Sequence, residues 1–317
     1  MAAPNHSKKI ALYCSYQLGK TLPGYVSFAL KHLAETEFHV VLLTNERELS
    51  DATYEFLADN DIELFLTQNH GFDFGMWRRY LQLQSNTGKA TPNSDTPFNA
   101  IERLLLINDS IVYFQDNFKE FFKRAEESEA DVVSLCSNTQ FAPHLQSFFL
   151  YMKPPAFGAF YLHLFETAEQ EDFYKAIRYL EVGLSEKFLE GGVHMESLYH
   201  TERDILFSYP EIIAQGAGFV KRKLLQCRFS RKEKIHFIRQ GAMNALNMDY
   251  KALVKQAGLA PDFKEEWIPT RIASKIRYKI DLLWENAYRK AAWPALRKAI
   301  KIKYKLLRKP LNGDEYR

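Results

Sequence analysis

Three short apolar runs separated by helical patterns fill the first 70 residues, and this alternation limits the fold more than any other feature of the chain. The runs are KKIALYCSY at 8–16, FHVVLLTN at 38–45 and DIELFLTQN at 61–69. Apolar residues at helical spacing follow the first run, and a second helical pattern begins at Ser50, a residue type that caps helices. Strands that alternate with helices predict an α/β fold with a parallel sheet between helices.

The alternation continues beyond residue 100. We expect strands at 101–110, 131–136 and 144–153, and helices near 117–127, at 156–167 and at 171–190. Polar residues fill 84–97, which we interpret as a surface loop, with a lid over a binding site as one hypothesis for its role.

Composition excludes several protein classes. With 317 residues, 46% hydrophobic and 26% charged, the chain has the make-up of a globular protein and not of collagen, a disordered segment or a disulfide scaffold. Its three cysteines, Cys14, Cys136 and Cys227, are widely spaced and predict reduced thiols. The N-terminal sequence MAAPNHSKK lacks the apolar core of a signal peptide, so we expect a cytoplasmic protein.

Charge is divided unevenly along the chain. The total is +3, but residues 270–317 hold 14 Lys and Arg against 4 Asp and Glu, a net of +10, and residues 1–269 hold 28 against 35, a net of −7. We therefore expect a mildly acidic globular domain at 1–269 and a basic tail at 270–317. About ten excess positive charges favour a polyanionic partner, either a phospholipid membrane or a nucleic acid.

Apolar residues recur every three or four positions at the start of this tail. They are Ile272, Ile276, Ile280, Leu283, Trp284, Ala287 and Ala291. This spacing predicts an amphipathic helix, and its Trp and Tyr residues are types that favour a bilayer interface. We expect the tail to bind an anionic membrane surface. A helical subdomain packed on the core is the alternative, and we expect no nucleic acid partner.

Two polar clusters follow apolar runs, where ligands of open α/β sheets bind. In the first, Asp73 lies between Gly71 and Gly75, and small residues there permit close approach of a ligand. In the second, Asp109 lies between Asn108 and Ser110 and could present oxygen ligands to Mg²⁺ or Mn²⁺. A helix-capping role for Asp73 and a turn role for Asp109 are the alternatives.

Two further segments carry candidate side chains. His144 and Gln146 lie at the start of an apolar run and could donate hydrogen bonds to a sugar or phosphate, although a satisfied core histidine fits equally well. Glu181 lies among apolar residues in a helical pattern, which suits a general base, and a salt-bridged surface glutamate is the alternative. The chain contains no GxGxxG, GxxxxGK[ST], GxSxG or HExxH motif.

Four of these segments, in order, resemble the rhamnan synthesis protein F family of bacterial glycosyltransferases. They are NHGFDFGMW at 69–77, LLLINDSIVY at 104–113, HLQSFFLYMK at 144–153 and YLEVGLSEKFLEGG at 179–192. The resemblance extends from about residue 8 to about residue 200. It implies a GT-A-like fold, a nucleotide-diphospho-sugar donor, typically dTDP-L-rhamnose, and inverting transfer to a polyprenyl-diphosphate-linked glycan acceptor in polysaccharide biosynthesis.

The resemblance also implies roles for individual residues. Glu181 matches the family's acid and becomes the catalytic base, and Asp109 occupies the place of the Asp-x-Asp metal motif of many GT-A enzymes. Ser110 and Ile111 follow Asp109, so the second carboxylate is missing and the dependence on Mg²⁺ or Mn²⁺ is in doubt. The remaining candidates are the residues expected to bind the nucleotide and donor, Asn69, Gly71, Asp73, Gly75, Asn108 and Ser110, and those expected to face the donor sugar or acceptor, His144, Gln146 and Ser147.

Enzymes of this kind act at the inner face of the cytoplasmic membrane, so the resemblance gives the basic tail a role as a peripheral membrane anchor. Two other functions remain open from the sequence. The chain could be a glycosyltransferase with a different nucleotide-sugar donor, or a non-catalytic glycan- or nucleotide-binding subunit of a polysaccharide assembly complex.

Overall fold

The computed structural model describes residues 8–16, 19–68, 70–84, 101–138, 142–200 and 205–222. The chain divides into two compact units, one formed by Met1–Gln226 with Ala242–Pro261 and the other by Cys227–Gly241 with Asp262–Arg317. All described residues belong to the first unit. The expected tail, the boundary that precedes it, nearly all of the loop at 84–97 and the candidate Asn69 lie outside the described residues, so those expectations stay predictions.

The described residues form a mixed sheet of eight strands, which confirms the α/β fold. Its order is β3-β2-β1-β4-β8-β6-β7, with β9 beside β6. The strands are β1 Lys9–Cys14, β2 His39–Thr44, β3 Glu63–Leu66, β4 Arg103–Asn108, β6 Val132–Asn138, β7 His144–Leu145, β8 Phe149–Met152 and β9 Met195–Tyr199. The first four are parallel to one another, as expected, while β8 runs antiparallel to both β4 and β6.

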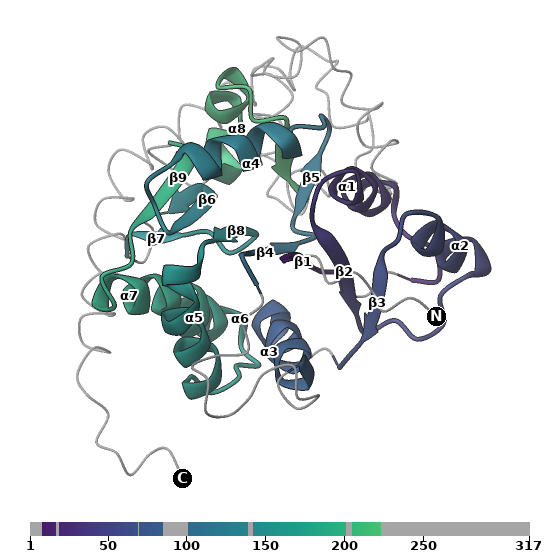
Figure 1. Ribbon diagram of the computed structural model, residues 1–317, viewed down its shortest axis with the longest axis horizontal. Helices are drawn as coiled ribbons and strands as arrows, with labels where there is room; N and C mark the ends of the chain where they lie inside the picture. Colours follow the sequence, from purple (N-terminus) through teal and green to yellow (C-terminus); the bar gives the residue numbers. More distant parts are fainter. Residues whose placement is uncertain are drawn as a thin grey trace, which may run out of the picture. The chain divides into compact units, whose positions relative to one another are not determined.

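Helices cover both faces of this sheet (Figure 1). One layer contains α1 (Gly24–Ala34) and α4 (Phe118–Glu127), and the other contains α3 (Phe72–Gln84), α5 (Pro154–Glu166) and α7 (Gly183–Glu190). Another predicted helix, α2 (Asp51–Asp59), packs beside β3, and the hydroxyl of Ser50 accepts a hydrogen bond from the amide of Thr53 at 3.3 Å. Ser50 is therefore the N-cap of α2, as predicted.

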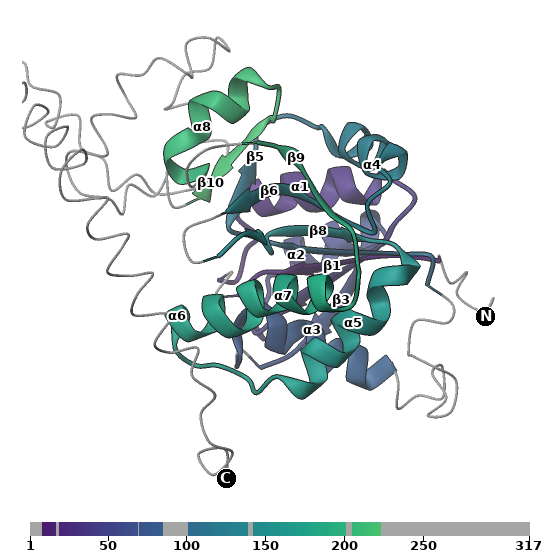
Figure 2. The same ribbon diagram turned by 90° about the vertical axis from the view of Figure 1, so that its left-hand side faces the viewer.

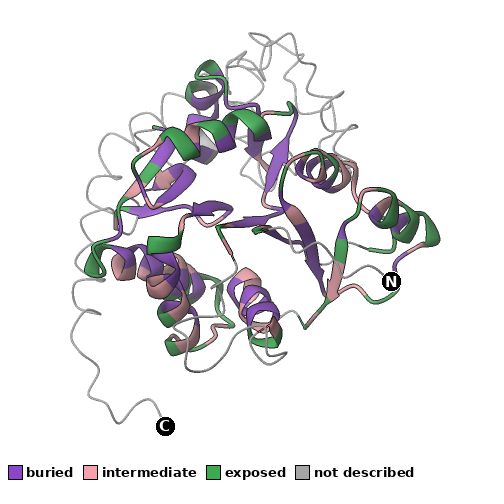
Figure 3. Ribbon diagram, viewed as in Figure 1, coloured by how far each residue is buried: buried purple, intermediate pink, exposed green. Residues whose placement is uncertain are grey.

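Burial on both faces explains why the strands have continuous apolar sequences. Leu104, Leu105, Leu106 and Ile107 of β4 are all fully buried (Figure 3). Successive side chains of a strand point to opposite faces, and a sheet covered by helices on both sides must bury them all. Cys14 and Cys136 are buried and form no disulfide within the described residues, and Cys227 lies outside them.

The single strand expected at 144–153 is wrong. The segment forms two strands, β7 and β8, which pair with opposite ends of β6. At the break, the amide of Gln146 donates to the carbonyl of Cys136 at 3.0 Å, and the next amide, that of Ser147, donates to the carboxylate of Glu181 at 2.6 Å. A side chain from a distant helix thus takes the hydrogen bond that a neighbouring strand would otherwise accept.

A helix is confirmed at the expected 171–190, but its middle is not an α-helix. It begins with α6 (Phe173–Lys175), continues as the π-helical turn η2 (Ala176–Val182) and ends with α7. Single π-helical turns inside α-helices occur often at functional sites. The expected base, Glu181, belongs to η2.

A small second sheet joins the end of the described chain to the main sheet. The strand β10 (Phe219–Lys221) pairs antiparallel with β5 (Ile111–Tyr113), which directly follows β4. The helix α8 (Ile205–Ala214) leads into β10, and Figure 2 shows α8, β10 and β5 on the same side of the sheet. The sequence patterns did not indicate β5, β9, α8 or β10. Among the described residues, none of the helices has the length and apolar content needed to span a membrane.

Candidate active site

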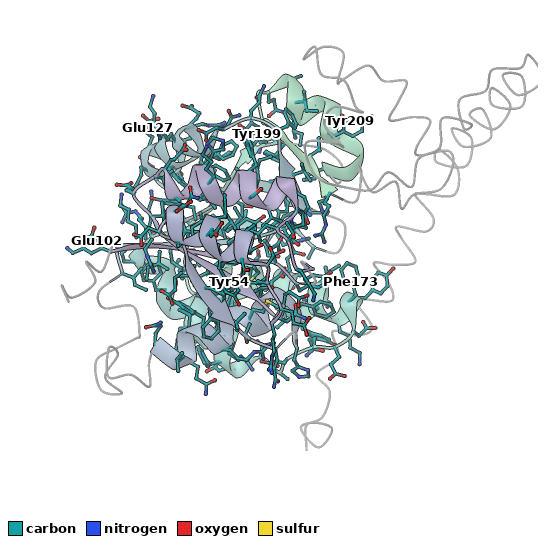
Figure 4. All side chains as sticks on the ribbon, turned by 90° about the vertical axis from the view of Figure 1, so that its right-hand side faces the viewer. Tyr54, Glu102, Glu127, Phe173, Tyr199 and Tyr209 are labelled. Atoms are coloured by element: carbon teal, nitrogen blue, oxygen red, sulfur yellow. The ribbon has the colours of Figure 1, made fainter. Side chains whose placement is uncertain are left out.

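The carboxyl ends of β1 and β4 lie side by side at a topological switch point. From β1 the chain proceeds to β2 on one side, and β4 pairs with β1 on the other. The amide of Asp109, directly after β4, donates to the carbonyl of Cys14, the last residue of β1, at 3.1 Å. Ligands of open α/β sheets bind at such points. In Figure 4, Glu102 marks the amino end of β4, and Phe173 of α6 lies on the opposite side of the molecule.

Asp109 lies at the centre of a buried hydrogen-bond network. Only 3% of the residue is exposed. Its Oδ2 accepts hydrogen bonds from the hydroxyl of Ser15 at 2.6 Å and the phenol of Tyr25 at 3.4 Å. Nη1 of Arg222, which follows β10, lies 2.6 Å from the same oxygen and 2.7 Å from the Tyr25 phenol oxygen. Side chains from three distant parts of the chain, around residues 15–25, 109 and 222, therefore meet at one carboxylate oxygen.

Arg222 provides the counter-charge of Asp109. Burial raises the pKa of the Asp109 carboxyl, and the guanidinium of Arg222 acts against that rise. In return, the negative charge of Asp109 raises the pKa of Arg222. A guanidinium is protonated throughout the physiological range, so the two side chains form a buried ion pair.

Asp73 lies beside this network at the start of α3. Its Oδ2 accepts a hydrogen bond from Nδ2 of Asn108 at 2.6 Å, so the two polar clusters of the sequence are in direct contact. Gly71, with a φ of 75°, precedes the first helical residue, so Asp73 is not the N-cap. A Cβ atom on Gly75 would lie 1.9 Å from the carbonyl oxygen of His70, so this position accepts only glycine.

The Asp73 carboxyl has an unusual pKa. Its removal from water, followed by the charge of Asp109 and by the smaller effect of Glu181, raises the pKa to about 7. The hydrogen bond from Asn108 acts in the opposite direction. Asp73 therefore changes its charge near neutral pH, which is typical of carboxylates that lie together in a site.

Ser110 supports Asn108. Its amide, at 3.0 Å, and its hydroxyl, at 2.5 Å, both donate to Oδ1 of Asn108. This leaves Nδ2 of Asn108 directed at Asp73. The sequence NDS at 108–110 thus forms a turn in which Asp109 binds Arg222 and Asn108 binds Asp73.

Glu181 and the residue before it, Leu180, are each held by a neighbouring segment. Its Oε1 accepts a hydrogen bond from the amide of Ser147 at 2.6 Å, and within the described parts of the chain its Oε2 accepts none. Next to it, the carbonyl of Leu180 lies 2.9 Å from Nε2 of His163 on α5. Since a carbonyl oxygen only accepts, His163 carries its hydrogen on Nε2. Burial lowers the pKa of His163 to about 4, so this histidine is neutral at pH 7.

His144 and Gln146 are both buried, with 4% of each residue exposed. Nδ1 of His144 lies 2.7 Å from the carbonyl oxygen of Ala142, a local contact within its own turn. Oε1 of Gln146 has no hydrogen-bond partner among the described residues. His144 thus has a local partner at Nδ1, and the roles of His144, Gln146 and Ser147 toward a sugar stay predictions.

One group of possible metal ligands occurs in the described chain, and it lies away from this site. His32, Glu35 and Asp116 bring one ligand atom each within 4.8 Å of one another. Both carboxylates contact the same atom, Nδ1 of His32, at 3.0 and 3.3 Å. A proton on Nδ1 satisfies both contacts without an ion. His32 lies seven residues from Tyr25 along α1, about 10 Å.

Arg222, Ser15 and Tyr25 were not among the residues predicted for the site. Ser15 follows the first apolar run, so its place at the carboxyl end of a strand was a usable signal. Arg222 had no such signal, because 113 residues separate it from Asp109 and only the pairing of β5 with β10 brings them together. The expected divalent ion at Asp109 stays a prediction.

Asparagine in place of Asp73 is expected to raise the free energy of unfolding at pH 8 and to change it little at pH 5. Because the pKa of Asp73 is raised to about 7, the folded chain holds this proton more tightly than the unfolded chain between about pH 4 and pH 7. The free energy of unfolding of the natural protein therefore falls as the pH rises through this interval, by at most about 1.4 kcal/mol per pH unit. The asparagine side chain stays uncharged at every pH, so the variant does not lose stability in this way as the pH rises.

Urea titrations of the natural protein and Asp73→Asn at pH 5 and pH 8 measure this difference. Asp59→Asn, on the exposed face of α2, gives the baseline for the loss of one carboxylate. An equal effect of Asp73→Asn at both pH values would show that Asp73 does not titrate in this interval.

Comparison with known proteins gives distant structural likenesses. No protein-family model matches the sequence. No curated protein matches it either. Among solved structures, the chain is similar to the galactosyltransferase LgtC in complex with donor and acceptor sugar analogues, at 10% identity over 81% of this chain and 98% of that chain, with a TM-score of 0.39.

Two nucleotidyltransferases show likenesses of the same order. A 4-diphosphocytidyl-2C-methyl-D-erythritol synthase from Anaerococcus prevotii matches at 9% identity over 62% of this chain and 90% of that chain, with a TM-score of 0.38. A cytidylyltransferase from Leptospira borgpetersenii matches at 11% identity over 63% of this chain and 78% of that chain, with a TM-score of 0.35. At these TM-scores the likenesses establish neither an activity nor a substrate.

Proposed function

We propose that this chain is an inverting glycosyltransferase with a GT-A-like fold that transfers a deoxyhexose, L-rhamnose from dTDP-L-rhamnose, to a polyprenyl-diphosphate-linked glycan. The identity of the donor and acceptor comes from the sequence resemblance. The site geometry supports the wider proposal of transfer from a nucleotide-diphospho-sugar.

The observation that carries the proposal is the pairing of the four sequence segments. The first contacts the second through Asp73 and Asn108, at 2.6 Å. The third contacts the fourth through Ser147 and Glu181, also at 2.6 Å. The charge of Glu181 raises the pKa of Asp73, so the two pairs are near enough to interact. Segments that recur in order in a family are expected to meet in this way when they build one site.

The arrangement of Glu181 suits proton transfer. The amide of Ser147 holds Oε1, which fixes the carboxylate and leaves Oε2 to accept the proton of an acceptor hydroxyl. The hydroxyl oxygen then attacks the anomeric carbon from the face opposite the diphosphate, and the C–O bond to the diphosphate breaks with its electron pair on the leaving oxygen. One such displacement inverts the configuration at the anomeric carbon.

Two parts of the proposal concern the membrane. The lipid-linked acceptor and a location at the inner face of the cytoplasmic membrane rest on the family resemblance and on the charge and apolar pattern of residues 270–317. A basic amphipathic tail would hold the transfer site near an acceptor that is anchored in the bilayer.

A donor panel tests the proposed function. The full chain is incubated with dTDP-L-rhamnose, UDP-glucose, UDP-galactose or GDP-mannose and a synthetic polyprenyl-diphosphate-linked acceptor. We expect release of dTDP and a product heavier by one deoxyhexose, with reactions lacking acceptor as the control for hydrolysis. Transfer from another donor would overturn the rhamnose assignment alone, and transfer from none would overturn the proposed function.

A further inference from the structure

We propose that Arg222 is the cation that binds the donor diphosphate, in the place where GT-A enzymes with an Asp-x-Asp motif use a divalent metal ion, and that Asp109 is its counter-ion. This inference rests on the proposed function and deepens it. It predicts that the protein binds nucleoside diphosphates without a metal ion.

The hydrogen bonds of Arg222 leave part of the guanidinium available. Nη1 carries two N–H groups, which donate to Asp109 at 2.6 Å and Tyr25 at 2.7 Å. A guanidinium has five N–H donors in a planar fork, so these two bonds leave three donors on Nε and Nη2. The Tyr16 phenol also hydrogen-bonds to Arg222, which leaves at least two of the three, and the side chain of Arg222 is 19% exposed.

The site therefore presents a fixed fork of donors at the switch point of the sheet. Such a fork matches two phosphate oxygens at once, which makes arginine well suited to bind phosphate groups. The two Nη1 hydrogen bonds and the backbone hydrogen bond from the Arg222 amide to the Ser110 carbonyl, at 2.8 Å, hold it beside the turn at 108–110. Because the Arg222 side chain is already held in place, binding of a ligand costs little further side-chain entropy.

A divalent ion does not fit at Oδ2 of Asp109, the oxygen that faces Arg222. A Mg²⁺ ion binds carboxylate oxygens at about 2.1 Å. At Oδ2 of Asp109 it would lie within a few ångströms of the guanidinium, which is itself 2.6 Å from that oxygen. Ser15 and Tyr25 donate to the same oxygen, so its lone pairs are already engaged. A metal ion there would have to displace Arg222, whereas a diphosphate would bind to it.

The test compares nucleotide affinities with and without metal. Calorimetric titrations with dTDP, UDP and thymidine are made in EDTA and again in Mg²⁺, using the natural protein, Arg222→Gln, Arg222→Lys and Arg103→Gln. Arg103 is a matched control, because it forms an ion pair with Glu126 at 2.8 Å at the amino end of β4, opposite the end that Asp109 follows. Thermal unfolding followed by circular dichroism checks that each variant is folded.

We expect equal diphosphate affinities in EDTA and in Mg²⁺. Arg222→Gln should weaken diphosphate binding about ten- to hundredfold, the size of a lost hydrogen bond to a charged group, and leave thymidine binding unchanged. Arg222→Lys keeps the charge but not the fork, so a smaller loss is expected. If Arg222→Gln does not fold, the diphosphate affinity of Arg222→Lys tests the inference in its place.

Two results would overturn the inference and leave the proposed function standing. One is diphosphate binding that requires Mg²⁺, and the other is full diphosphate affinity in EDTA for folded Arg222 variants. Failure of the natural protein to bind either diphosphate under both conditions would instead contradict both the inference and the proposed function.

Discussion

Glutamine in place of Glu181 is expected to lower the turnover number about a hundred- to ten-thousandfold, the usual contribution of a general base. The amide has the shape of the carboxylate and can still accept the hydrogen bond that the Ser147 amide donates at 2.6 Å. It cannot take a proton from an acceptor hydroxyl. The affinity for the nucleotide sugar should change little, because the loss arises only in the transition state.

Steady-state kinetics with the donor and acceptor that the natural protein uses would measure both quantities. Glu186→Gln is a matched control, since Glu186 lies five residues further along in α7 and pairs with Arg178 at 2.9 Å. We expect that control to retain turnover and to lose at most about 1 kcal/mol of stability. Unchanged turnover in Glu181→Gln would show that Glu181 is not the base.

The sheet was largely predictable because its strands carry a strong signal. The runs that became β1, β2 and β4 are apolar on both faces, and helical patterns follow them at short intervals. Only a parallel arrangement covered by helices on both sides buries such runs completely. The antiparallel strands β8 and β6 gave no comparable sign of their direction, so the sheet proved to be mixed.

The errors occurred where distant contacts override local pattern. Residues 144–153 are apolar enough for one strand, but the Glu181 carboxylate takes the amide of Ser147 and splits the run into β7 and β8. The π-helical turn that carries Glu181 also has no local signature, and the contact of His163 with Leu180 lies across two helices. Strands of three residues, such as β5 and β10, are too short for periodicity to detect.

The candidate site was predictable in part for a related reason. Asn108 ends β4 and Asp73 comes after β3, two strands of a parallel arrangement whose carboxyl ends share one edge, and the two side chains prove to be hydrogen-bonded. The positive charge of the site could not be predicted in the same way. Arg222 follows a three-residue strand near the end of the described chain, and its position depends on the register of β10 on β5.

Asparagine in place of Asp109 is expected to lower the free energy of unfolding by about 3 kcal/mol, the lower end for removal of one partner from a buried ion pair. The oxygen of the substituted amide could still accept hydrogen bonds from Ser15 and Tyr25. The loss of the negative charge leaves the guanidinium of Arg222, with 19% of its side chain exposed, without a counter-charge. The loss of stability therefore comes from the unpaired guanidinium of Arg222, and removal of that charge should restore the free energy of unfolding.

A double-mutant cycle tests this account. Asp109→Asn combined with Arg222→Met removes both charges, and replacement of a buried ion pair by uncharged groups of similar size is often close to neutral. We expect the double variant to be more stable than Asp109→Asn in urea titrations, and to bind diphosphates as weakly as Arg222→Gln. The same cycle on Arg103 and Glu126, whose side chains are 24% and 34% exposed, should give a coupling of at most about 1 kcal/mol. Additive losses at Asp109 and Arg222 would mean that the two side chains do not stabilise each other, and Asp109 would then again be open to a metal ion.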